Sequence, residues 1–298
     1  MWKFKHPSFD IKPSRGGRLE GRKIVLALTG SIAILQAPSL ARSLLRLGAE
    51  VYPVMTPKAA SMINPELLEW ATGNPPVTEI TGKLENIAAV LGLPPEGKID
   101  LLLVAPCTAN TLAKIAHGIN DNAVTGFVQV AYTAGVPILL APAMHLQLLS
   151  NPITQENLNK LRGLGFKIVE PKIEEGKAKM APIEEIVEAV VETLTVKSLA
   201  GVRILVTAGP TREPLDPIRV ITNRSSGKMG VAVAREAARR GAEVTLVYGP
   251  GSVKPPSNVK VIPVETSKEM FESSLSELKA KRYHVFIAAA AMADYTSE

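Results

Sequence analysis

Residues 223–230, Asn-Arg-Ser-Ser-Gly-Lys-Met-Gly, carry amide, hydroxyl and ammonium groups just before a segment with helical spacing. Such groups bind phosphate, because the first N–H groups of a helix are unpaired and its dipole favours an anion. The P-loop pattern would also require glycine at position 222 and serine or threonine at position 229, where this chain has Thr222 and Met229. The stretch is therefore either a different phosphate-handling loop or a solvated turn that caps a helix.

Three stretches in the first half of the chain place small or polar residues directly after an apolar run. Gly30 and Ser31 follow the first run, Thr56 follows the second, and Thr108 and Asn110 follow the third. Each stretch alone is typical of a helix cap. Because the carboxyl ends of parallel strands meet at one edge of a sheet, the three together favour a phosphorylated ligand at that edge.

A fourth apolar run ends at Pro142, and Met144 and His145 follow it. A histidine on a loop at the ligand edge is a candidate acid or base, although a lone histidine is more often structural. The four histidines show no metal-ligand spacing, and the single cysteine, Cys107, excludes an intramolecular disulfide and a multi-cysteine metal site. Cys107 follows an apolar strand and is better interpreted as a small buried residue than as a reactive thiol.

Short apolar runs alternate with helical patterns and must position these residues. Continuous runs of Val, Ile and Leu are typical of parallel strands buried on both faces, so we predict a doubly wound α/β sheet. The pattern restarts near residue 202, which predicts a second α/β unit. The expected strands are 23–30, 50–56, 99–106, 136–142 and 166–171, then 202–208, 243–249, 259–264 and 283–291; the expected helices include 32–47, 108–117, 152–163, 183–195 and 228–240.

We predict a basic N-terminal tail over 1–21, a first domain over 22–195, a linker over 196–201 and a second domain over 202–298. The net charge of the 298 residues is +6, and residues 1–23 hold seven basic and two acidic residues. This local excess of +5 predicts a solvated arm rather than a nucleic-acid-binding domain. No apolar run is long enough to span a membrane and no signal-peptide pattern is visible, so we expect a cytoplasmic protein with no membrane or nucleic-acid partner.

Four stretches in order, "TGSIA" (29–33), "TEITGKLEN" (78–86), "APCTANTLAKIAHGIND" (105–121) and "PAMHLQLLSNP" (142–152), resemble the homo-oligomeric flavin-containing cysteine decarboxylases. The resemblance covers residues 22–195 and is most specific for the decarboxylase half of bifunctional phosphopantothenoylcysteine decarboxylase/phosphopantothenate–cysteine ligases. It implies a flavodoxin-like fold and a trimer or dodecamer. It also implies FMN held by Gly30, Ser31, Thr56, Thr108, Asn110 and Met144, and release of CO2 from phosphopantothenoylcysteine after the flavin has oxidised its thiol.

The chain departs from this family at three places. Asn86 stands where the family has an active-site histidine, and asparagine cannot act as an acid or base near neutral pH. In the substrate clamp, His145 replaces asparagine and Leu148 replaces methionine. The flap segment 174–182 contains no cysteine, although the bacterial enzymes use one there. We therefore expect flavin binding with impaired decarboxylation, in which Asn86 and His145 are the residues in question.

The stretches "TAGPTREPLDPIRVITNRSSGKMG" (207–230) and "AAAAMADY" (288–295) resemble the opening of the ligase half of the same bifunctional family. The resemblance implies a Rossmann-like second domain, incomplete in this sequence because a lysine-containing loop of the family has no counterpart. It also implies that CTP and 4′-phosphopantothenate form an acyl-cytidylate, which cysteine then captures as an amide, with Mg²⁺ bridging the triphosphate oxygens.

The ligase resemblance also assigns residues to this reaction. Asn223 contacts the acyl-cytidylate, Lys228 acts beside it, and Arg219 lies near the same site. The other nucleotide- and substrate-binding residues are Gly209, Pro210, Thr211, Ser225, Ser226, Gly227, Ala289 and Asp294; no metal ligand is identified. Two alternatives to this enzyme are a non-catalytic flavin-binding scaffold or regulatory subunit, which Asn86 and the missing cysteine favour, and a flavin prenyltransferase-like protein, which the ligase-like half disfavours.

Overall fold

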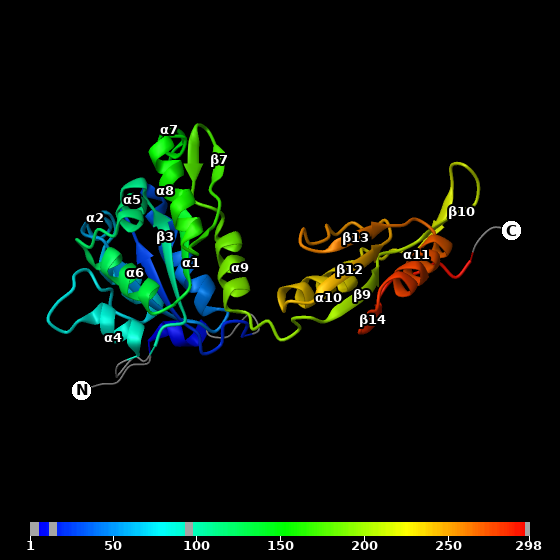
Figure 1. The fold of residues 1–298 in the computed structure, drawn as a ribbon, viewed down its shortest axis with the longest axis horizontal. Helices are drawn as coiled ribbons and strands as arrows, with labels where there is room; N and C mark the ends of the chain where they lie inside the picture. The colour runs from blue at the N-terminus through cyan, green and yellow to red at the C-terminus, as the bar shows by residue number, and fades with distance from the viewer. Residues whose placement is uncertain (1–5, 12–16, 93–97, 296–298) are drawn as a thin grey trace. The chain divides into compact units, whose positions relative to one another are not determined.

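The computed structural model of the protein describes residues 6–11, 17–92 and 98–295 (Figure 1). The chain divides into two compact units, residues 1–194 and 195–298. Each unit contains its own parallel sheet. No helix in the described ranges is long and apolar enough to cross a membrane.

The first unit is built on a five-stranded parallel sheet in the order β2-β1-β3-β4-β6. The central strands are buried because both faces of the sheet are covered by helices, which confirms the doubly wound fold predicted from the continuous apolar runs. The strand order reverses between β1 and β3, so the carboxyl ends of these two strands form the switch point of the sheet. The strands are β1 (Lys23–Leu28), β2 (Glu50–Met55), β3 (Leu101–Cys107), β4 (Ile138–Pro142) and β6 (Lys167–Ile168).

Helices cover the two faces in separate layers. Alternate residues of β1 point to opposite sides, with Leu26 in one apolar cluster and Val25 in the other. One layer contains η2 (Ile32–Gln36), α1 (Ala37–Leu45), α2 (Pro57–Met62), α3 (Pro65–Thr72) and α9 (Ile183–Leu194). The other contains α4 (Glu85–Leu91), α5 (Ala109–His117), α6 (Ala123–Thr133) and α8 (Pro152–Gly163).

Several predicted elements differ from the structure at their ends; the strands expected over 166–171 and 283–291, for example, span only Lys167–Ile168 and Val285–Ala288. The helix expected over 32–47 begins as the 3₁₀ turn η2, which Ser31 caps, and Pro38 then lies in the first turn of α1. The strand expected from residue 99 begins at Leu101, and the Asp100 carboxylate just before it accepts hydrogen bonds from the Arg22 guanidinium and the Lys23 amide, both at 2.8 Å.

A small antiparallel sheet that the apolar runs do not predict stands beyond β4. It contains β5 (Met144–His145), β7 (Lys172–Glu174) and β8 (Lys177–Lys179), and β8 lies between the other two strands. The helix α7 (Leu146–Leu149) follows β5 directly. In the same unit, the short 3₁₀ helix η1 (Pro7–Ile11) contacts α1 and α3.

The second unit has a four-stranded parallel sheet in the order β13-β12-β9-β14. Its strands are β9 (Arg203–Ala208), β12 (Glu243–Tyr248), β13 (Lys260–Pro263) and β14 (Val285–Ala288), and its helices are α10 (Lys228–Arg239) and α11 (Ser267–Ala280). An antiparallel hairpin of β10 (Arg212–Pro214) and β11 (Val220–Thr222) connects β9 to α10. The switch point of this sheet lies between β9 and β14.

The residues expected to form a linker, 196–201, lie within the second compact unit. The Leu199 amide donates to the carbonyl of Arg240 at 2.9 Å, and the Lys197 ammonium donates to the carbonyl of Arg239 at 2.8 Å. The turn therefore packs on the end of α10. Part of the predicted N-terminal tail, residues 1–5 and 12–16, lies outside the described residues.

Candidate functional sites at two switch points

The switch point of the first unit holds a pocket of about 380 Å³, which we call the switch-point pocket. It brings together Gly30, Thr56, Thr108 and Asn110, four of the residues predicted to bind a phosphorylated ligand. Its lining is completed by Pro57, Lys58, Thr111, Lys114, Asp121 and Asn122. The convergence predicted from three separate stretches of sequence is therefore present as one pocket.

The hydroxyl groups at this edge cap helices, as the alternative interpretation predicted. Thr56 Oγ1 accepts from the Ala59 amide at 3.2 Å, and Thr108 Oγ1 accepts from the Thr111 amide at 3.3 Å. Ser31 Oγ accepts from the Ala33 amide at 3.4 Å. A hydroxyl group has two acceptor positions and one proton, so capping a helix leaves it able to bond a ligand as well.

Four charged or amide side chains of the pocket were missed by sequence reasoning: Lys58, Lys114, Asp121 and Asn122. Lys114 and Asp121 form an ion pair at 2.5 Å, and the Asn122 amide donates to the same carboxylate at 2.8 Å. The Lys114 hydrogen bond, with help from Asn122, holds the pKa of Asp121 below its ordinary value. The spacing of Lys114 and Asp121 across the end of α5 could have indicated the pair.

The predicted substrate clamp lies against the predicted flap. Met144 pairs with Ala178 and His145 pairs with Lys177 in the β5–β8 ladder, and the Leu146 amide donates to the carbonyl of Gly176 at 3.1 Å. The His145 side chain is exposed, and its Nδ1 lies 3.3 Å from Oε1 of Gln147. The structure thus brings together clamp and flap through backbone pairing and leaves the imidazole accessible.

Asn86 lies in the first turn of α4 and is only 8% exposed. It faces α6, where a Cβ added to Gly126 would lie 3.5 Å from Asn86 Nδ2. Its Oδ1 has no hydrogen-bond partner within the described part of the chain. Asn86, predicted as a catalytic residue, is not among the residues that line the switch-point pocket.

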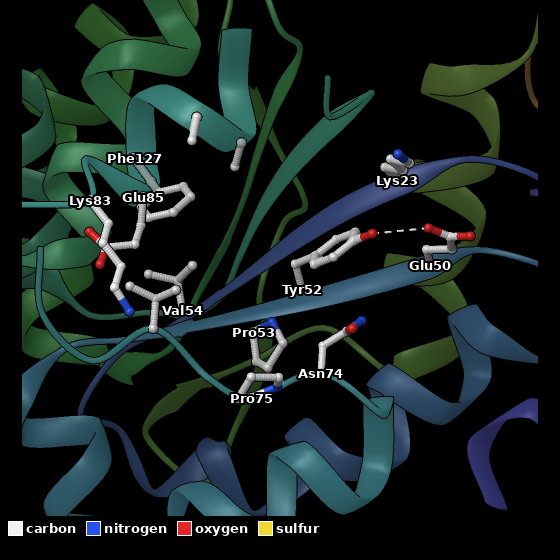
Figure 2. Close-up of a pocket in the computed structure, with 13 residues that line it drawn as sticks. Lys23, Glu50, Tyr52, Pro53, Val54, Asn74, Pro75, Lys83, Glu85 and Phe127 are labelled. Atoms are coloured by element: carbon white, nitrogen blue, oxygen red, sulfur yellow. Dashed lines mark hydrogen bonds between the residues drawn. The ribbon is translucent and has the colours of Figure 1, made fainter. Parts of the chain in front are cut away.

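A larger cavity, of about 600 Å³, runs along the edge strand β2 (Figure 2). Figure 2 shows Phe127, Lys83 and Glu85 toward one end and Tyr52 with Glu50 toward the other; the Tyr52 hydroxyl donates to Glu50 at 3.0 Å. None of its lining residues was predicted as a site residue. The smaller switch-point pocket is the better functional candidate, because ligands of doubly wound sheets bind beyond the carboxyl ends of the strands.

The switch point of the second unit collects most of the predicted nucleotide-binding residues. Pro210 forms a parallel bridge with Ala291, and the Thr211 amide donates to the carbonyl of Ala291 at 3.3 Å. Asn223 Nδ2 donates to the same carbonyl at 2.5 Å, and Asn223 Oδ1 accepts from the Ser225 amide at 3.1 Å. The Asn223 side chain therefore connects the loop before α10 to the segment after β14 through hydrogen bonds.

Three glycines allow the backbone to approach closely here. A Cβ on Gly249 would lie 1.8 Å from the carbonyl oxygen of Pro210. Gly227 has φ +80°, and a Cβ on it would lie 2.8 Å from the Tyr248 ring; Gly209 has φ +85°. The hydroxyls of Ser225 and Ser226 accept from the amides of Gly227 and Lys228 respectively. Side chains at these three positions would collide with the neighbouring backbone or the Tyr248 ring, so glycine is required for the close approach of these segments.

Three other predicted residues of this unit lie apart from that cluster or at its margin. Arg219 lies in the turn of the β10–β11 hairpin and pairs with Asp216 at 2.5 Å, and its side chain is 76% exposed. Asp294 lines a separate cavity of about 360 Å³ at the start of α11. Ala289 follows β14, and its amide donates to the carbonyl of Thr207 at 3.1 Å. The guanidinium of Arg219 therefore pairs within its own hairpin turn.

Sequence reasoning also missed Glu213, a carboxylate only 6% exposed beside the start of α11. Its Oε1 accepts from the Ser267 amide at 2.7 Å, and Ser267 Oγ lies 2.9 Å from Thr211 Oγ1. Burial alone would raise the pKa of Glu213, but hydrogen bonds from Ser267 and Thr211 outweigh it and lower the pKa. Glu213 thereby connects the hairpin to α11.

The described residues contain no group of three or more His, Cys, Asp or Glu side chains placed to hold a metal ion. Cys107 is fully buried, and burial raises the pKa of its thiol to about 12. This confirms that Cys107 is a small buried residue.

Comparisons with known proteins match both units. Residues 13–195 match the Flavoprotein family, and residues 199–298 match the DNA/pantothenate metabolism flavoprotein C-terminal domain. The chain is 54% identical over 286 residues to the coenzyme A biosynthesis bifunctional protein CoaBC of Thermococcus kodakarensis, covering 96% of this chain and 70% of the relative. It is 39% identical over 287 residues to CoaBC of Escherichia coli, covering 93% and 68%.

Solved structures resemble the first unit. The FMN-dependent cysteine decarboxylase SpaF has a TM-score of 0.50 at 31% identity and covers 59% of this chain and 98% of its own. The peptidyl-cysteine decarboxylase EpiD has a TM-score of 0.50 at 26% identity and covers 57% and 98%. Because the match to the CoaBC relatives runs through both units and both switch points, this chain belongs to the family of coenzyme A biosynthesis bifunctional proteins CoaBC.

Proposed function

We propose that the protein acts in coenzyme A biosynthesis as a bifunctional enzyme. The second unit ligates 4′-phosphopantothenate with cysteine at the expense of CTP, and the first unit decarboxylates the resulting 4′-phosphopantothenoylcysteine to 4′-phosphopantetheine with FMN. One observation carries the proposal: 54% identity to a CoaBC protein extends across both units. The pocket or loop at the switch point of each unit is consistent with it.

The switch-point pocket fits an FMN phosphate. It is lined by hydroxyl and amide groups and by two lysines, of which one is neutralised by Asp121. We assign flavin binding to Gly30, Ser31, Thr56, Thr108 and Asn110, with Met144 at the clamp. When bound, FMN supplies the two-electron chemistry at the substrate thiol, and the protein orients the substrate and manages protons.

Asn86 limits the decarboxylation that we propose. It is buried and cannot transfer a proton near neutral pH, so the exposed His145 is left as the titratable side chain of the clamp. We expect Asn86→His to raise CO₂ release from phosphopantothenoylcysteine by about 100-fold, the usual size of a general acid or base contribution. Asn86→Gln serves as the control without a titratable group. Equal and robust CO₂ release by the wild type and Asn86→His would show that Asn86 does not limit the reaction.

A second candidate function is a non-catalytic flavin-binding scaffold or regulatory subunit. Asn86 and the absence of cysteine from residues 174–182 favour it. Pyrophosphate release that depends on CTP and phosphopantothenate separates the two: the enzyme releases pyrophosphate and the scaffold does not.

For the ligase reaction we assign Asn223 to the acyl-cytidylate and Lys228 to its phosphate, with Gly209, Pro210, Thr211, Ser225, Ser226, Gly227, Ala289 and Asp294 around the nucleotide. We infer that Mg²⁺ bridges triphosphate oxygens, because Mg²⁺ commonly takes most of its ligands from phosphates and water. We expect Asn223→Ala to lower the rate of amide formation by at least about tenfold, since a lost hydrogen bond to a charged intermediate costs about 1.5–3 kcal/mol. An unchanged rate would contradict the role of Asn223.

We also propose that the first unit forms a homo-oligomer, a trimer or a dodecamer. Large apolar side chains are exposed at Ile32 (74%) and Leu35 (64%), directly beside the predicted flavin residues Gly30 and Ser31. Light scattering of the purified protein tests this, and a monomer at micromolar concentration would contradict it. A cytoplasmic location stays a prediction.

A further inference from the structure

We infer that Lys58 is the residue with which the switch-point pocket recognises a phosphomonoester, and that Gly30 is its positioning residue. The inference rests on the proposed flavin-dependent function and adds to it a charge-recognition residue that no family motif named above includes. The phosphomonoester is either that of FMN or the 4′-phosphate of the substrate, because both present the same dianionic group.

The first step is the path of the Lys58 side chain. A Cβ added to Gly30 would lie 2.4 Å from Cγ and 2.9 Å from Cβ of Lys58. Real Cβ atoms do not approach other atoms so closely, so the stem of Lys58 occupies the space that any side chain at position 30 would fill. Because these are the near atoms of the lysine stem rather than its flexible end, Lys58 cannot avoid the added methyl group by rotating its ammonium alone.

The second step is charge. The three ionisable side chains that line the pocket are Lys58, Lys114 and Asp121. Lys114 and Asp121 neutralise one another at 2.5 Å, whereas Lys58 forms no ion pair with any described residue. Lys58 therefore gives the pocket a net positive charge and three N–H donors.

Neutral hydroxyl groups line the same pocket as the Lys58 ammonium. Thr56 Oγ1 accepts from a backbone amide of α2 and leaves its hydroxyl proton for another acceptor. Thr108 Oγ1 accepts from a backbone amide of α5 and donates to Thr111 Oγ1 at 3.2 Å, so a ligand oxygen would have to replace Thr111 as its acceptor. One lysine with two threonines suits a compact, doubly charged oxyanion better than a neutral ring system, which needs apolar contact area.

The test compares ligands that differ only in the phosphate. Apoprotein is titrated with FMN and with riboflavin, and the ratio of the two dissociation constants is measured for the wild type and for Lys58→Met. We expect Lys58→Met to reduce the preference for FMN by at least about tenfold with little change in riboflavin affinity. Lys58→Arg should keep most of the preference, because arginine also binds phosphate.

Two substitutions are matched controls. Lys160→Met removes an exposed lysine of α8 that does not line the pocket, and it should leave the ratio unchanged. Gly30→Ala should reduce the FMN preference as Lys58→Met does, with little further reduction when the two are combined. Gly163→Ala, where an added Cβ meets no atom within 4 Å, should leave the ratio unchanged.

A second set of titrations identifies the source of the phosphate. Flavin-loaded protein is titrated with phosphopantothenoylcysteine and with pantothenoylcysteine. If Lys58→Met lowers only the preference for FMN over riboflavin, Lys58 binds the cofactor phosphate. If it lowers only the preference for phosphopantothenoylcysteine over pantothenoylcysteine, Lys58 binds the substrate phosphate. Either result supports the inference. If Lys58→Met preserves both preferences, the inference is overturned while the flavin function stands. If the wild type binds neither FMN nor riboflavin, the flavin function fails and the inference fails with it.

Discussion

At the scale of single residues, the same side chains serve folding and ligand binding. Thr56 and Thr108 cap helices, and at Thr56 this structural use leaves a hydroxyl proton for a ligand. In the second unit, Asn223 Nδ2 donates to the Ala291 carbonyl and Asn223 Oδ1 accepts from the Ser225 amide. The orientation of the Asn223 side chain is therefore fixed before a nucleotide binds. A residue held in this way costs less entropy to use in binding than a mobile one does.

Cys107 provides a prediction at this scale. Because its thiol is fully buried and burial raises its pKa to about 12, the thiolate that reacts with disulfides is almost absent at pH 8. We expect the native protein to release negligible thionitrobenzoate from Ellman's reagent, and one equivalent per chain in denaturant, since the chain has one cysteine. Rapid modification in the native state would contradict the burial. Cys107→Ala should also leave CO₂ release unchanged.

At the scale of elements, the strands and helices that bury apolar residues were the ones predicted from the sequence. The continuous apolar runs located the strands of both sheets, and α8 begins and ends as expected, at Pro152 and Gly163. The strands of the β10–β11 hairpin and of the β7–β8 flap were not predicted, because they are three residues long and mostly exposed. Short exposed strands carry neither a buried run nor a clear alternation.

The candidate sites were predictable to a similar extent. Polar residues directly after apolar runs, such as Thr56 and Thr108, were found because the carboxyl ends of parallel strands converge. Lys58 and Glu213 were missed, since their positions depend on contacts that only the tertiary structure creates. The stem of Lys58 packs in the space that a side chain at Gly30 would fill. Glu213 accepts a hydrogen bond from the amide of Ser267, which lies 54 residues further along the chain.

Two glycine-to-alanine substitutions in helices should have effects of opposite sign. In α10, a Cβ on Gly230 would lie 2.3 Å from Cβ of Ala208, so Gly230→Ala should destabilise the second unit by about 1–3 kcal/mol through overpacking. In α8, Gly163 has open space, so Gly163→Ala should stabilise the first unit by up to about 1 kcal/mol. Thermal unfolding followed by circular dichroism measures both effects. Effects of the same sign would contradict the close approach of α10 to β9.

Glu213 gives a pH-dependent prediction about α11. Its folded pKa is lowered, because hydrogen bonds from Ser267 and Thr211 outweigh burial. The stabilisation is therefore fully present above the ordinary glutamate value of 4.5 and is lost as the pH falls through the lower folded pKa. We expect Glu213→Gln to destabilise α11 at pH 7 by about 1–2 kcal/mol, and by less in acid.

Hydrogen exchange of peptides from α11 measures the effect of Glu213→Gln. Exchange should be faster in the variant at pH 7, and the two proteins should converge when Glu213 is protonated. Glu272→Gln changes an exposed carboxylate of the same helix and is the matched control. Equal protection of the wild type and Glu213→Gln at pH 7 would show that the carboxylate does not hold the start of α11.

At the scale of the whole molecule, each unit has its own sheet, its own apolar clusters and its own switch point. The first unit buries an extensive core on both faces of its sheet, with clusters on each side. In the second unit the cluster between the sheet and α11 is small, containing Leu205, Val247 and Met270, and Phe271 on α11 is 65% exposed. The units are therefore expected to differ in stability as well as in ligand.

Because the two sites are built from different cores, their activities should be separable by substitution. Thr56→Val removes a hydroxyl of the switch-point pocket and should weaken FMN binding by about tenfold, with no effect on CTP-dependent pyrophosphate release. Asn223→Ala should do the reverse, lowering ligation while the dissociation constant of FMN stays unchanged. Both activities are measured on the same preparation of each variant, so loss of folded protein would reduce both signals together. If either substitution changed the other unit's activity while circular dichroism showed a folded protein, the two sites would be coupled, and the independence that their separate cores imply would be refuted.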